Sequence, residues 1–309
     1  MFSHITVPVD GSHFAESAIP YATSIARRTD GRVELVIVEE AGLPPRVIER
    51  IDRLGIEPDS PEAEQRSPAA HYIAELAAAV HRRSGVPVTA AVLAGRPVDA
   101  LVEHIGRTGT SLVVMATHGR GAFSRVWLGG VADEMAHVAA APVLLVRPRK
   151  KDEPVPEDVT LREVLVPLDG SPHGEEVLTL AAPLAAATDA HLTLLRVAEI
   201  RMLAGSPFAP NMIQFDDVGL EAERAQAEQY LDGVAARLRH RGFTVRTAVI
   251  EGIPAMDVIA YADEHDADVI AMSTHGYGGL KRLLLGSVAD KVLRGTHRPV
   301  LLYRPVGTG

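Results

Sequence analysis

Short apolar runs, many of them rich in Val, Ile and Leu, alternate along the chain with longer stretches in which apolar positions recur every three or four residues. Runs that are apolar throughout are typical of strands buried on both faces, as in a parallel sheet covered by helices. The regular alternation of these strands with amphipathic helices predicts a doubly wound α/β fold with right-handed crossovers. We expect strands at residues 5–9, 33–38, 86–93, 112–116, 143–146, 164–168, 192–197, 244–250, 269–272 and 300–303.

Helices are expected between these strands, and long loops are expected in two places. Residues 41–67 and 201–217 show little periodicity, and each segment follows the second strand of its half, so we interpret both as long loops. Pro8 and Pro167 fall near the ends of strands, and because proline has no N–H to donate, the ladder should be interrupted there. The expected helices span residues 12–28, 68–84, 97–107, 131–139, 174–187, 220–241, 255–265 and 287–295.

The two halves of the chain repeat one another. The segments ITVPVDGS, THGRG and PVLLVRP of the first half return as VLVPLDGS, THGYG and PVLLYRP in the second. A repeat this long indicates a duplicated domain, and the charged, proline-bearing segment between the copies is typical of a linker. The prediction is therefore two tandem Rossmann-like domains, at residues 1–148 and 161–309, joined by a linker at 149–160.

Composition narrows the function classes. The net charge of −9 and the sequence pI of about 5.8 argue against nonspecific binding to nucleic acids or to membrane surfaces. The chain has no cysteine, which excludes disulfides, thiol catalysis and zinc–thiolate sites. Because we find neither an apolar run of membrane-spanning length nor a secretory leader pattern, we expect a cytoplasmic protein.

An Asp-Gly-Ser turn follows the first strand of each half. In an open parallel sheet, ligands bind beyond the carboxyl ends of the strands, where the winding reverses, and both turns should lie there. Asp10 and Asp169 could accept hydrogen bonds from a ribose hydroxyl or an adenine amino group, while Gly11 and Gly170 let a ligand approach the backbone. The same residue types are good helix caps and turn formers, so a purely structural role is equally open for this turn taken alone.

Two glycine-rich elements should join each turn at that edge. The loop after the fourth strand can present consecutive backbone N–H groups to an anion, and the start of the last helix favours a phosphate through its free N–H groups and its dipole. Nine residues separate the two elements in both halves, counted from Gly119 to Gly129 and from Gly276 to Gly286. The candidate residues are His118, Gly119, Arg120, Gly121, Gly129, Gly130 and Val131, and then His275, Gly276, Tyr277, Gly278, Gly286, Ser287 and Val288.

With these motifs the chain resembles a tandem, two-domain member of the universal stress protein family. The family pattern is Gly-x2-Gly-x9-Gly-Ser/Thr, preceded far upstream by Val-x-x-Asp-Gly-Ser, and the resemblance covers nearly all of both halves. It implies ATP bound with its phosphates along the glycine loop and its adenosine near the early aspartate, with Mg²⁺ accompanying the nucleotide. It also implies that the backbone of Val38 and Val197 meets the adenine.

The two halves depart from the family pattern to different degrees. The second half has Ser273 in place of the first glycine and keeps the hydroxyl of Ser287. The first half has Ala116 at the first position and Gly130 at the last, so neither side chain can offer a hydroxyl to a ligand. We therefore expect both halves to bind ATP, with the tighter site in the C-terminal half.

Other nucleotide-binding and catalytic signatures are missing from the sequence. It has no Walker lysine, no three-glycine fingerprint after the first strand, no nucleophile elbow and no His-Glu-x-x-His motif, so we assign no catalytic residue and no protein metal site. The leading hypothesis is an ATP-binding stress-response regulator with at most slow hydrolysis, in which nucleotide occupancy changes the conformation or the choice of an unidentified protein partner. Two alternatives stay open, a Mg²⁺-dependent ATPase or phosphotransferase and a nucleotide-independent protein-interaction module.

The last strand of each half indicates how the two halves could pair with one another. Residues 143–146 and 300–303 would each lie at a sheet edge, which is a liability unless the edge is paired. We expect these two strands to pair within the chain, so that the halves form a pseudo-dimer that mimics a family homodimer. Association of the whole chain into a homodimer stays open.

Overall fold

The computed structural model divides the chain into two units, each of mixed α/β architecture as the sequence predicts. Unit 1 comprises Met1–Thr160 and Pro299–Arg304, and unit 2 is built from Leu161–Arg298. The structure describes residues 1–39, 67–117, 128–148, 156, 158–199, 202–203, 214–215, 217–274 and 285–304, without the side chains of 202–203, 214–215 and 217–218.

Unit 1 is a parallel sheet flanked by helices, with one antiparallel strand added from the end of the chain. The described strands run in the order β12-β5-β4-β1-β2-β3, and only β12 is antiparallel to its neighbour β5. The elements are β1 (His4–Val9), α1 (His13–Glu16), α2 (Ile19–Arg28), β2 (Arg32–Glu39), α4 (Pro68–Ser84), β3 (Val88–Ala94), α5 (Pro97–Thr108), β4 (Leu112–Ala116), α6 (Gly130–Val138), β5 (Val143–Val146) and β12 (Val300–Tyr303).

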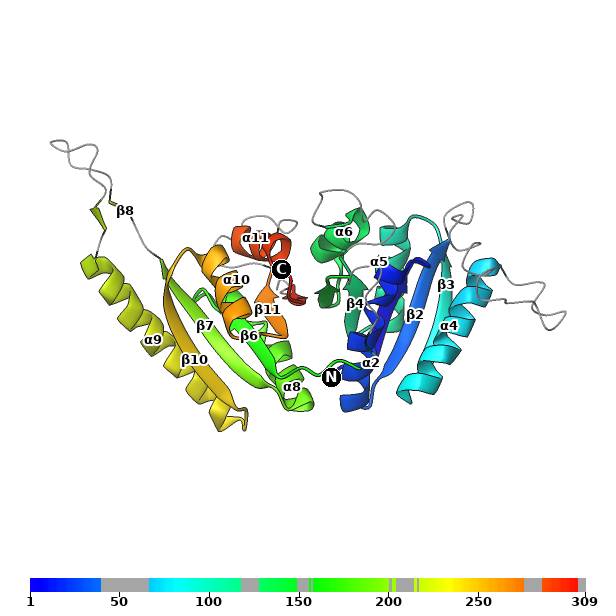
Figure 1. The fold of residues 1–309 in the computed structure, drawn as a ribbon, viewed down its shortest axis with the longest axis horizontal. Coiled ribbons are helices and arrows are strands. Elements are labelled where there is room, and N and C mark those ends of the chain that lie inside the picture. Colours follow the sequence, from blue (N-terminus) through cyan, green and yellow to red (C-terminus); the bar gives the residue numbers. More distant parts are fainter. Residues whose placement is uncertain are drawn as a thin grey trace. The chain divides into compact units, whose positions relative to one another are not determined.

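Unit 2 repeats this arrangement. Its strands follow the order β10-β7-β6-β11, which corresponds to β3-β2-β1-β4 of unit 1. Helix α9 lies along β10 and β7, as α4 lies along β3 and β2 (Figure 1). The elements are β6 (Glu163–Pro167), α7 (Pro172–Glu175), α8 (Leu178–Thr188), β7 (His191–Glu199), β8 (Met202–Leu203), β9 (Gln214–Phe215), α9 (Asp217–His240), β10 (Val245–Gly252), α10 (Pro254–Glu264), β11 (Val269–Ser273) and α11 (Ser287–Gly295).

The strand order fixes where a ligand can bind. In unit 1 the chain steps outward from β1 to β2 and β3 and then returns past β1 to β4 and β5. With right-handed crossovers, this reversal places α2 and α4 on one face of the sheet and α5 and α6 on the other. The crevice of such a fold opens at the carboxyl ends of β1 and β4, and by the same argument at the carboxyl ends of β6 and β11 in unit 2.

Local sequence signals explain the helix boundaries. Helix α4 begins after Ser67, whose hydroxyl accepts a hydrogen bond from the backbone N–H of Ala70, and Pro68 occupies the first turn, where its missing N–H costs nothing. The same helix ends at Gly85, which adopts a left-handed conformation with φ of 70°. The central strands are buried along most of their length, because helices cover both faces of each sheet.

The pairing of the last strand with its repeat is as the sequence predicts. Leu301 of β12 lies opposite Leu144 of β5, and its neighbours Val300 and Leu302 lie opposite Leu145 and Val143. Leu144 and Leu301 hold the same position in the two repeats, so the equivalent strands pair about a local two-fold point. The pseudo-dimer relation of the two halves as whole domains stays a prediction.

The proline positions interrupt the ladder on one side only. Strand β1 pairs with β2 through Pro8 as far as Val9, whereas its pairing with β4 ends at Thr6. In unit 2, β6 ends at Pro167, and its pairing with β11 ends at Leu165. The prolines therefore lie where each first strand separates from the fourth, which is the side on which the ligand crevice of this fold opens.

Three predicted segments differ from the structure. The helices expected at residues 12–28 and 174–187 are each split in two, because the backbone tightens there to hydrogen bonds that reach back three residues, such as Ala18 N to Ala15 O. The loop expected at residues 201–217 contains a short antiparallel pair, β8 and β9, and α9 begins at its last residue. Apart from Ser67, the loop expected at residues 41–67 lies outside the described residues.

The end of the predicted linker contacts unit 1. The Ser24 hydroxyl of α2 donates a hydrogen bond to the Val159 carbonyl, and Arg27 pairs with Asp158 at 3.2 Å. Both partners of the ion pair are about 40% exposed (42% and 41%), so it contributes little to stability. The described part of the linker is thus held mainly by the partly buried hydrogen bond from the Ser24 hydroxyl to the Val159 carbonyl.

Candidate nucleotide site

The aspartate turn after the first strand has the same geometry in both units. In unit 1, Asp10 Oδ1 accepts hydrogen bonds from the backbone N–H of Ser12 at 2.9 Å and from its hydroxyl at 2.6 Å. In unit 2, Asp169 Oδ1 accepts the same two bonds from Ser171 at the same distances. Each serine hydroxyl in turn caps the following helix, so the structural role that the sequence left open is observed.

The glycine of each turn is required by its backbone conformation. Gly11 and Gly170 have φ of 79° and 80°, a left-handed region that strains other residues. A Cβ atom on Gly170 would also lie 2.7 Å from Nη1 of Arg196, which is too close for two nonbonded atoms. The absence of a side chain at Gly170 therefore leaves room for the Arg196 guanidinium against the turn.

The start of the last helix is fixed to the end of the fourth strand in the same way in both units. The N–H of Gly129 donates to the Thr117 carbonyl at 2.7 Å, and the N–H of Gly286 donates to the Thr274 carbonyl, also at 2.7 Å. Those two N–H groups are therefore engaged within the fold. The N–H groups that have no acceptor inside the helices are the next three, at residues 130–132 and 287–289, and these are the donors that an anion would meet.

The two helix starts differ in what a side chain could add. A Cβ on Gly286 would lie 3.2 Å from the Thr274 carbonyl oxygen, so a larger residue there would press against the strand end. A Cβ on Gly130 would meet nothing within 4 Å. The space that the Ser287 side chain occupies in unit 2 is thus open at Gly130 in unit 1.

The strand end beside each helix start also differs between the units. The Ser273 hydroxyl at the end of β11 is buried and has no hydrogen-bond partner among the residues that the structure describes. A buried hydroxyl without a partner is unfavourable, and a ligand oxygen or nitrogen could satisfy it. Unit 1 has Ala116 at the matching position, so the unpaired hydroxyl exists only in unit 2.

Some of the remaining candidate residues lie within the described ranges, and others lie outside them. Val38 and Val197 lie near the carboxyl ends of β2 and β7, and Val131 and Val288 lie in the first turns of α6 and α11. Their contact with a nucleotide stays a prediction. The remaining glycine-loop candidates lie outside the described residues: His118, Gly119, Arg120, Gly121, His275, Gly276, Tyr277 and Gly278.

Sequence reasoning missed a charged residue beside the turn of unit 2. Arg196 lies in β7 one residue before Val197, and its Nη1 donates to the Leu168 carbonyl at 3.4 Å. Its guanidinium carbon is 5.8 Å from the centre of the Tyr230 ring on α9. The sequence signal for Arg196 was a charge within a mainly apolar strand. Such a charge is unusual for a residue that only packs in the core.

The surroundings of Tyr230 leave polar atoms unsatisfied. Its hydroxyl and the Nε of Arg196 are buried, and neither makes a hydrogen bond of good geometry to a described residue. Burial raises the pKa of Tyr230, and the charge of Glu175 and the approach of its carboxylate to the hydroxyl raise it further, so the phenol stays protonated. Glu175 itself is bound by Arg237 at 2.5 Å.

The corresponding corner of unit 1, where β2 lies against α4, has different residues and contacts. Tyr72 of α4 is fully buried, and its hydroxyl donates to Glu16 Oε1 at 2.7 Å. The strand position that matches Arg196 is occupied by Ile37, because Val36 pairs with Pro8 as Leu195 pairs with Pro167. The corner of unit 1 therefore has an apolar strand residue and a direct tyrosine–carboxylate bond.

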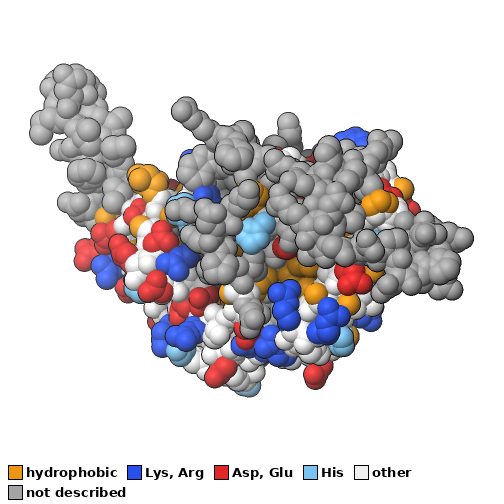
Figure 2. All heavy atoms as spheres, turned by 45° about the vertical axis from the view of Figure 1, so that its right-hand side comes forward, with side chains coloured by type: hydrophobic (Ala, Val, Ile, Leu, Met, Phe, Trp, Pro, Cys, Tyr) orange, Lys and Arg blue, Asp and Glu red, His pale blue; other side chains and the backbone are white. Residues whose placement is uncertain are grey.

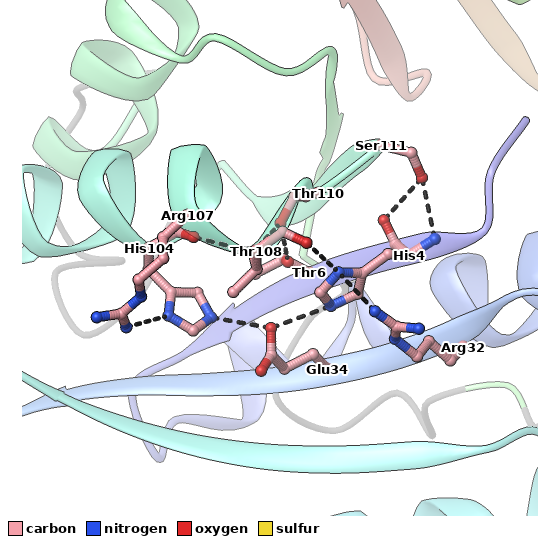
Figure 3. Close-up of polar contacts among 9 residues, drawn as sticks. All are labelled: His4, Thr6, Arg32, Glu34, His104, Arg107, Thr108, Thr110 and Ser111. Carbon is pink, nitrogen blue, oxygen red and sulfur yellow. Dashed lines mark hydrogen bonds and ion pairs between the residues drawn. The ribbon is translucent and has the colours of Figure 1, made fainter.

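A second polar cluster lies at the amino ends of the strands of unit 1, away from the crevice. Glu34 Oε2 is 3.1 Å from His4 Nε2 and 2.9 Å from His104 Nε2, and both histidines point toward this one carboxylate (Figure 3). Arg32 and Arg107 approach the other ring nitrogens at 3.4 Å each. Because a carboxylate only accepts hydrogen bonds, each Nε2 carries the proton, and the cluster is a satisfied polar part of the core.

Other classes of site find no support in the described residues. Within the described ranges, no three His, Asp or Glu side chains are grouped so that they could hold a metal ion. No described helix is both long enough and apolar enough to span a membrane. On the face drawn in Figure 2, the described acidic and basic side chains are interspersed, which is not the single-sign basic surface that nucleic-acid binding needs.

Comparison with known proteins gives the family. The sequence model of the universal stress protein family matches twice, at residues 1–147 and 160–304. A universal stress protein of Mycobacterium tuberculosis is 29% identical over 211 residues, which are 67% of this chain and 66% of that protein. A universal stress protein of Synechocystis is 21% identical over 318 residues, which are 97% of this chain and 99% of that protein.

The fold agrees with solved structures of that family. The structure of a universal stress protein from Archaeoglobus fulgidus superposes with a TM-score of 0.65 at 19% identity, covering 98% of this chain and 99% of that one. At this identity the likeness shows the fold alone. Because the family model matches nearly the whole chain in two copies, the protein belongs to the universal stress protein family as a tandem, two-domain member.

Proposed function

We propose that this universal stress protein is an ATP-binding regulator with at most slow hydrolysis, in which nucleotide occupancy changes the conformation or the binding of a protein partner. The observation that carries the proposal is the repeated helix start. In both units a glycine N–H is bound to the end of the fourth strand at 2.7 Å, and the next three N–H groups are left for an anion. In both units an Asp-Gly-Ser turn of the same geometry follows the first strand, at the end of the sheet where the crevice of this fold opens.

The residues at the crevice fit a nucleoside triphosphate. The first-turn N–H groups of α6 and α11 and their helix dipoles would hold phosphate oxygens, with the Ser287 hydroxyl as a further ligand in unit 2. The unpaired Ser273 hydroxyl lies at the same strand end. Asp10 and Asp169 would accept hydrogen bonds from the adenosine, and the backbone of Val38 and Val197 would meet the adenine.

Mg²⁺ is proposed to enter with the nucleotide rather than on a protein site. The described residues offer no cluster of three His, Asp or Glu side chains for a resident ion. A magnesium ion bound to the phosphates needs only one or two protein oxygens, and the Ser287 hydroxyl is suited to that role. The ion would neutralise phosphate charge.

The choice of a regulator over an enzyme rests on the described groups of the crevice. A hydrolase would need a base positioned against the attacking water. Asp10 and Asp169 use one oxygen each to fix the turn, which favours positioning over proton transfer. Fast turnover that Asp169→Ala abolishes would instead support the ATPase or phosphotransferase alternative.

Equilibrium dialysis of the full chain with Mg·ATP tests the proposal, combined with limited proteolysis with and without nucleotide. The proposal predicts saturable ATP binding together with a changed cleavage pattern, and ATP turnover that stays slow. Absence of ATP binding would contradict it and favour the nucleotide-independent interaction module. ATP binding with an unchanged cleavage pattern would contradict the coupling to conformation.

A further inference from the structure

The unsatisfied polar atoms at the adenosine end of unit 2 are hydrogen-bond donors. The guanidinium of Arg196 is half-buried, it makes one long bond to the Leu168 carbonyl at 3.4 Å, and its Nε has no partner among the described residues. The Tyr230 hydroxyl beside it is also buried and makes no hydrogen bond of good geometry to a described residue. A buried guanidinium with an unused donor is satisfied best by a ligand that brings acceptor oxygens.

The nearest carboxylate outside the turn does not supply those oxygens. Glu175 lies on α7 and is engaged by Arg237 at 2.5 Å. Its counterpart in unit 1, Glu16, accepts the tyrosine hydroxyl directly at 2.7 Å. In unit 2 the carboxylate is bound by Arg237 and approaches the Tyr230 hydroxyl without the well-formed bond seen in unit 1, so the Nε of Arg196 is the donor left without a partner among the described residues.

The location of Arg196 limits which part of a nucleotide it could meet. The phosphate donors are on α11, which follows β11, whereas Arg196 is on β7, and β6 lies between these two strands. Two strand spacings, about 10 Å, separate the backbones of β7 and β11, and the Arg196 guanidinium extends as far as the Leu168 carbonyl at the end of β6. A group bound by Arg196 would therefore lie beside the aspartate turn, on the β6 side of the phosphate donors of α11.

The turn that Arg196 contacts is the one proposed to hold the ribose. The guanidinium lies against Gly170, where a Cβ would come within 2.7 Å of Nη1, and it precedes Val197, whose backbone is proposed to meet the adenine. An arginine after the first turn of a dinucleotide-binding fold accommodates a phosphate on the ribose, whereas an acidic residue there binds free ribose hydroxyls. The fork of a guanidinium suits the oxygens of a phosphate monoester.

We infer that Arg196 gives the site of unit 2 a preference for adenine nucleotides that carry an additional phosphate on the ribose, at the 2′ or the 3′ position. Unit 1 has Ile37 at the matching position and would take nucleotides with unmodified ribose. The end of β2 instead has Glu39, whose buried Oε1 is an acceptor without a partner among the described residues. This inference rests on the proposed nucleotide site and names the ligand class of one of its two copies.

The test compares three probes on the full chain by isothermal titration: 5′-ADP, 2′,5′-ADP and 3′,5′-ADP. The inference predicts that one of the two ribose-phosphorylated probes binds about tenfold more tightly than 5′-ADP, and that Arg196→Leu removes this preference while 5′-ADP affinity changes by less than about twofold. Which probe is preferred distinguishes a 2′ from a 3′ phosphate. Arg196→Lys, which keeps the charge without the fork, should retain part of the preference.

Arg246→Leu is the matched control. Arg246 is 59% exposed near the amino end of β10, the strand beside β7, so the substitution removes the same charge at the end of the strands opposite to the crevice. It should leave the preference unchanged. Thermal melting checks that each variant is folded.

Three results would overturn the inference. Equal affinity of the wild type for all three probes contradicts it while leaving the proposed nucleotide site standing. A preference that survives in Arg196→Leu contradicts the role of that residue, and a loss of all three affinities in both Arg196 variants assigns it a structural role. If none of the three probes and no ATP bind the wild type, the proposed function itself fails.

Discussion

The two units have the same fold but differ at the corner where the second strand meets the following helix. In unit 1 a buried tyrosine, Tyr72, donates directly to Glu16, beside the apolar Ile37. In unit 2 the equivalent tyrosine, Tyr230, makes no hydrogen bond of good geometry to a described residue and lies beside a charged Arg196. A duplicated domain keeps its framework through the core and the turns, so a difference at a ligand-facing corner is a candidate for a separate ligand preference.

A second difference concerns the phosphate end. Unit 2 has a serine both at the end of its fourth strand and at the start of its last helix, whereas unit 1 has Ala116 and Gly130. The aspartate turns and the 2.7 Å bonds that fix the helix starts are the same in both. The backbone part of the proposed site is therefore duplicated, while the side-chain part is present mainly in unit 2.

The largest expected effect is on the strand pair that the repeats share. Leu144 is fully buried and lies opposite Leu301, so Leu144→Asp would place an unpaired charge in the centre of the β5–β12 pair. We expect a loss of about 3–5 kcal/mol in the free energy of unfolding, measured by urea denaturation. Ile253→Asp, at a position that is 58% exposed, is the control and should change stability little. A midpoint unchanged in Leu144→Asp would show that the pair does not hold the fold.

The next largest effect is a loss of ATP binding at the proposed site of unit 2 alone. Gly286→Val would press a side chain against the Thr274 carbonyl, which a Cβ already approaches to 3.2 Å, and would displace the first turn of α11. We expect ATP binding to unit 2 to fall by about a hundredfold, since several charge-assisted bonds are lost together, while unit 1 keeps its site. Titration calorimetry should show one class of site lost. Two intact classes would mean that the helix start is not the phosphate site.

The tyrosine corner offers a matched pair of substitutions. Tyr72→Phe removes a hydrogen bond from a buried tyrosine to a partly buried carboxylate and should cost about 1.5 kcal/mol. Tyr230→Phe removes a hydroxyl that Glu175 approaches without good hydrogen-bond geometry, so its cost should be clearly smaller than that of Tyr72→Phe. Thermal or urea unfolding of the two variants checks the difference. Equal costs would show that the Tyr230 hydroxyl is satisfied as well as that of Tyr72.

The smallest expected effect is on ATP affinity when the residue at the first position of the last helix is exchanged between the two units. Because a Cβ on Gly130 meets nothing within 4 Å, Gly130→Ser should fit, while Ser287→Gly removes the corresponding hydroxyl from unit 2. We expect ATP affinity to rise at the first site and to fall at the second, each by about 1 kcal/mol, as one hydrogen bond is added or removed. Titration of the two single variants and of the exchanged double variant measures both. A change of the same sign in both would contradict a ligand role for this hydroxyl.

Much of the fold followed from the sequence because the repeat tested each assignment twice. Buried strands such as 112–116 and 143–146 have a continuous apolar signal, and the helix at 68–84 has a serine before it and a glycine after it, so their boundaries were predicted correctly. The split of the first helix into α1 and α2 was missed, since the backbone stays helical there and only the hydrogen bonding tightens. The β8–β9 pair is too short for an alternating pattern to show.

The candidate site was predictable only where its chemistry lies in the backbone or in a motif. The turn glycines were found because their left-handed conformation restricts the sequence. Arg196 and Tyr230 were missed, because their pairing joins a strand to a helix across a segment of more than thirty residues that no local pattern connects. The partnerless state of Ser273 likewise depends on three-dimensional packing, which a sequence does not report.

The most direct test of the central claim is the nucleotide that leaves the gently purified chain on heat denaturation, identified and counted per chain. The account predicts adenine nucleotide, with the larger share lost when Gly286 is replaced by Val and a smaller share held by unit 1. Purified chain that releases no nucleotide, and that binds none when Mg·ATP is added, would contradict the claim that the repeated helix start is a nucleotide site.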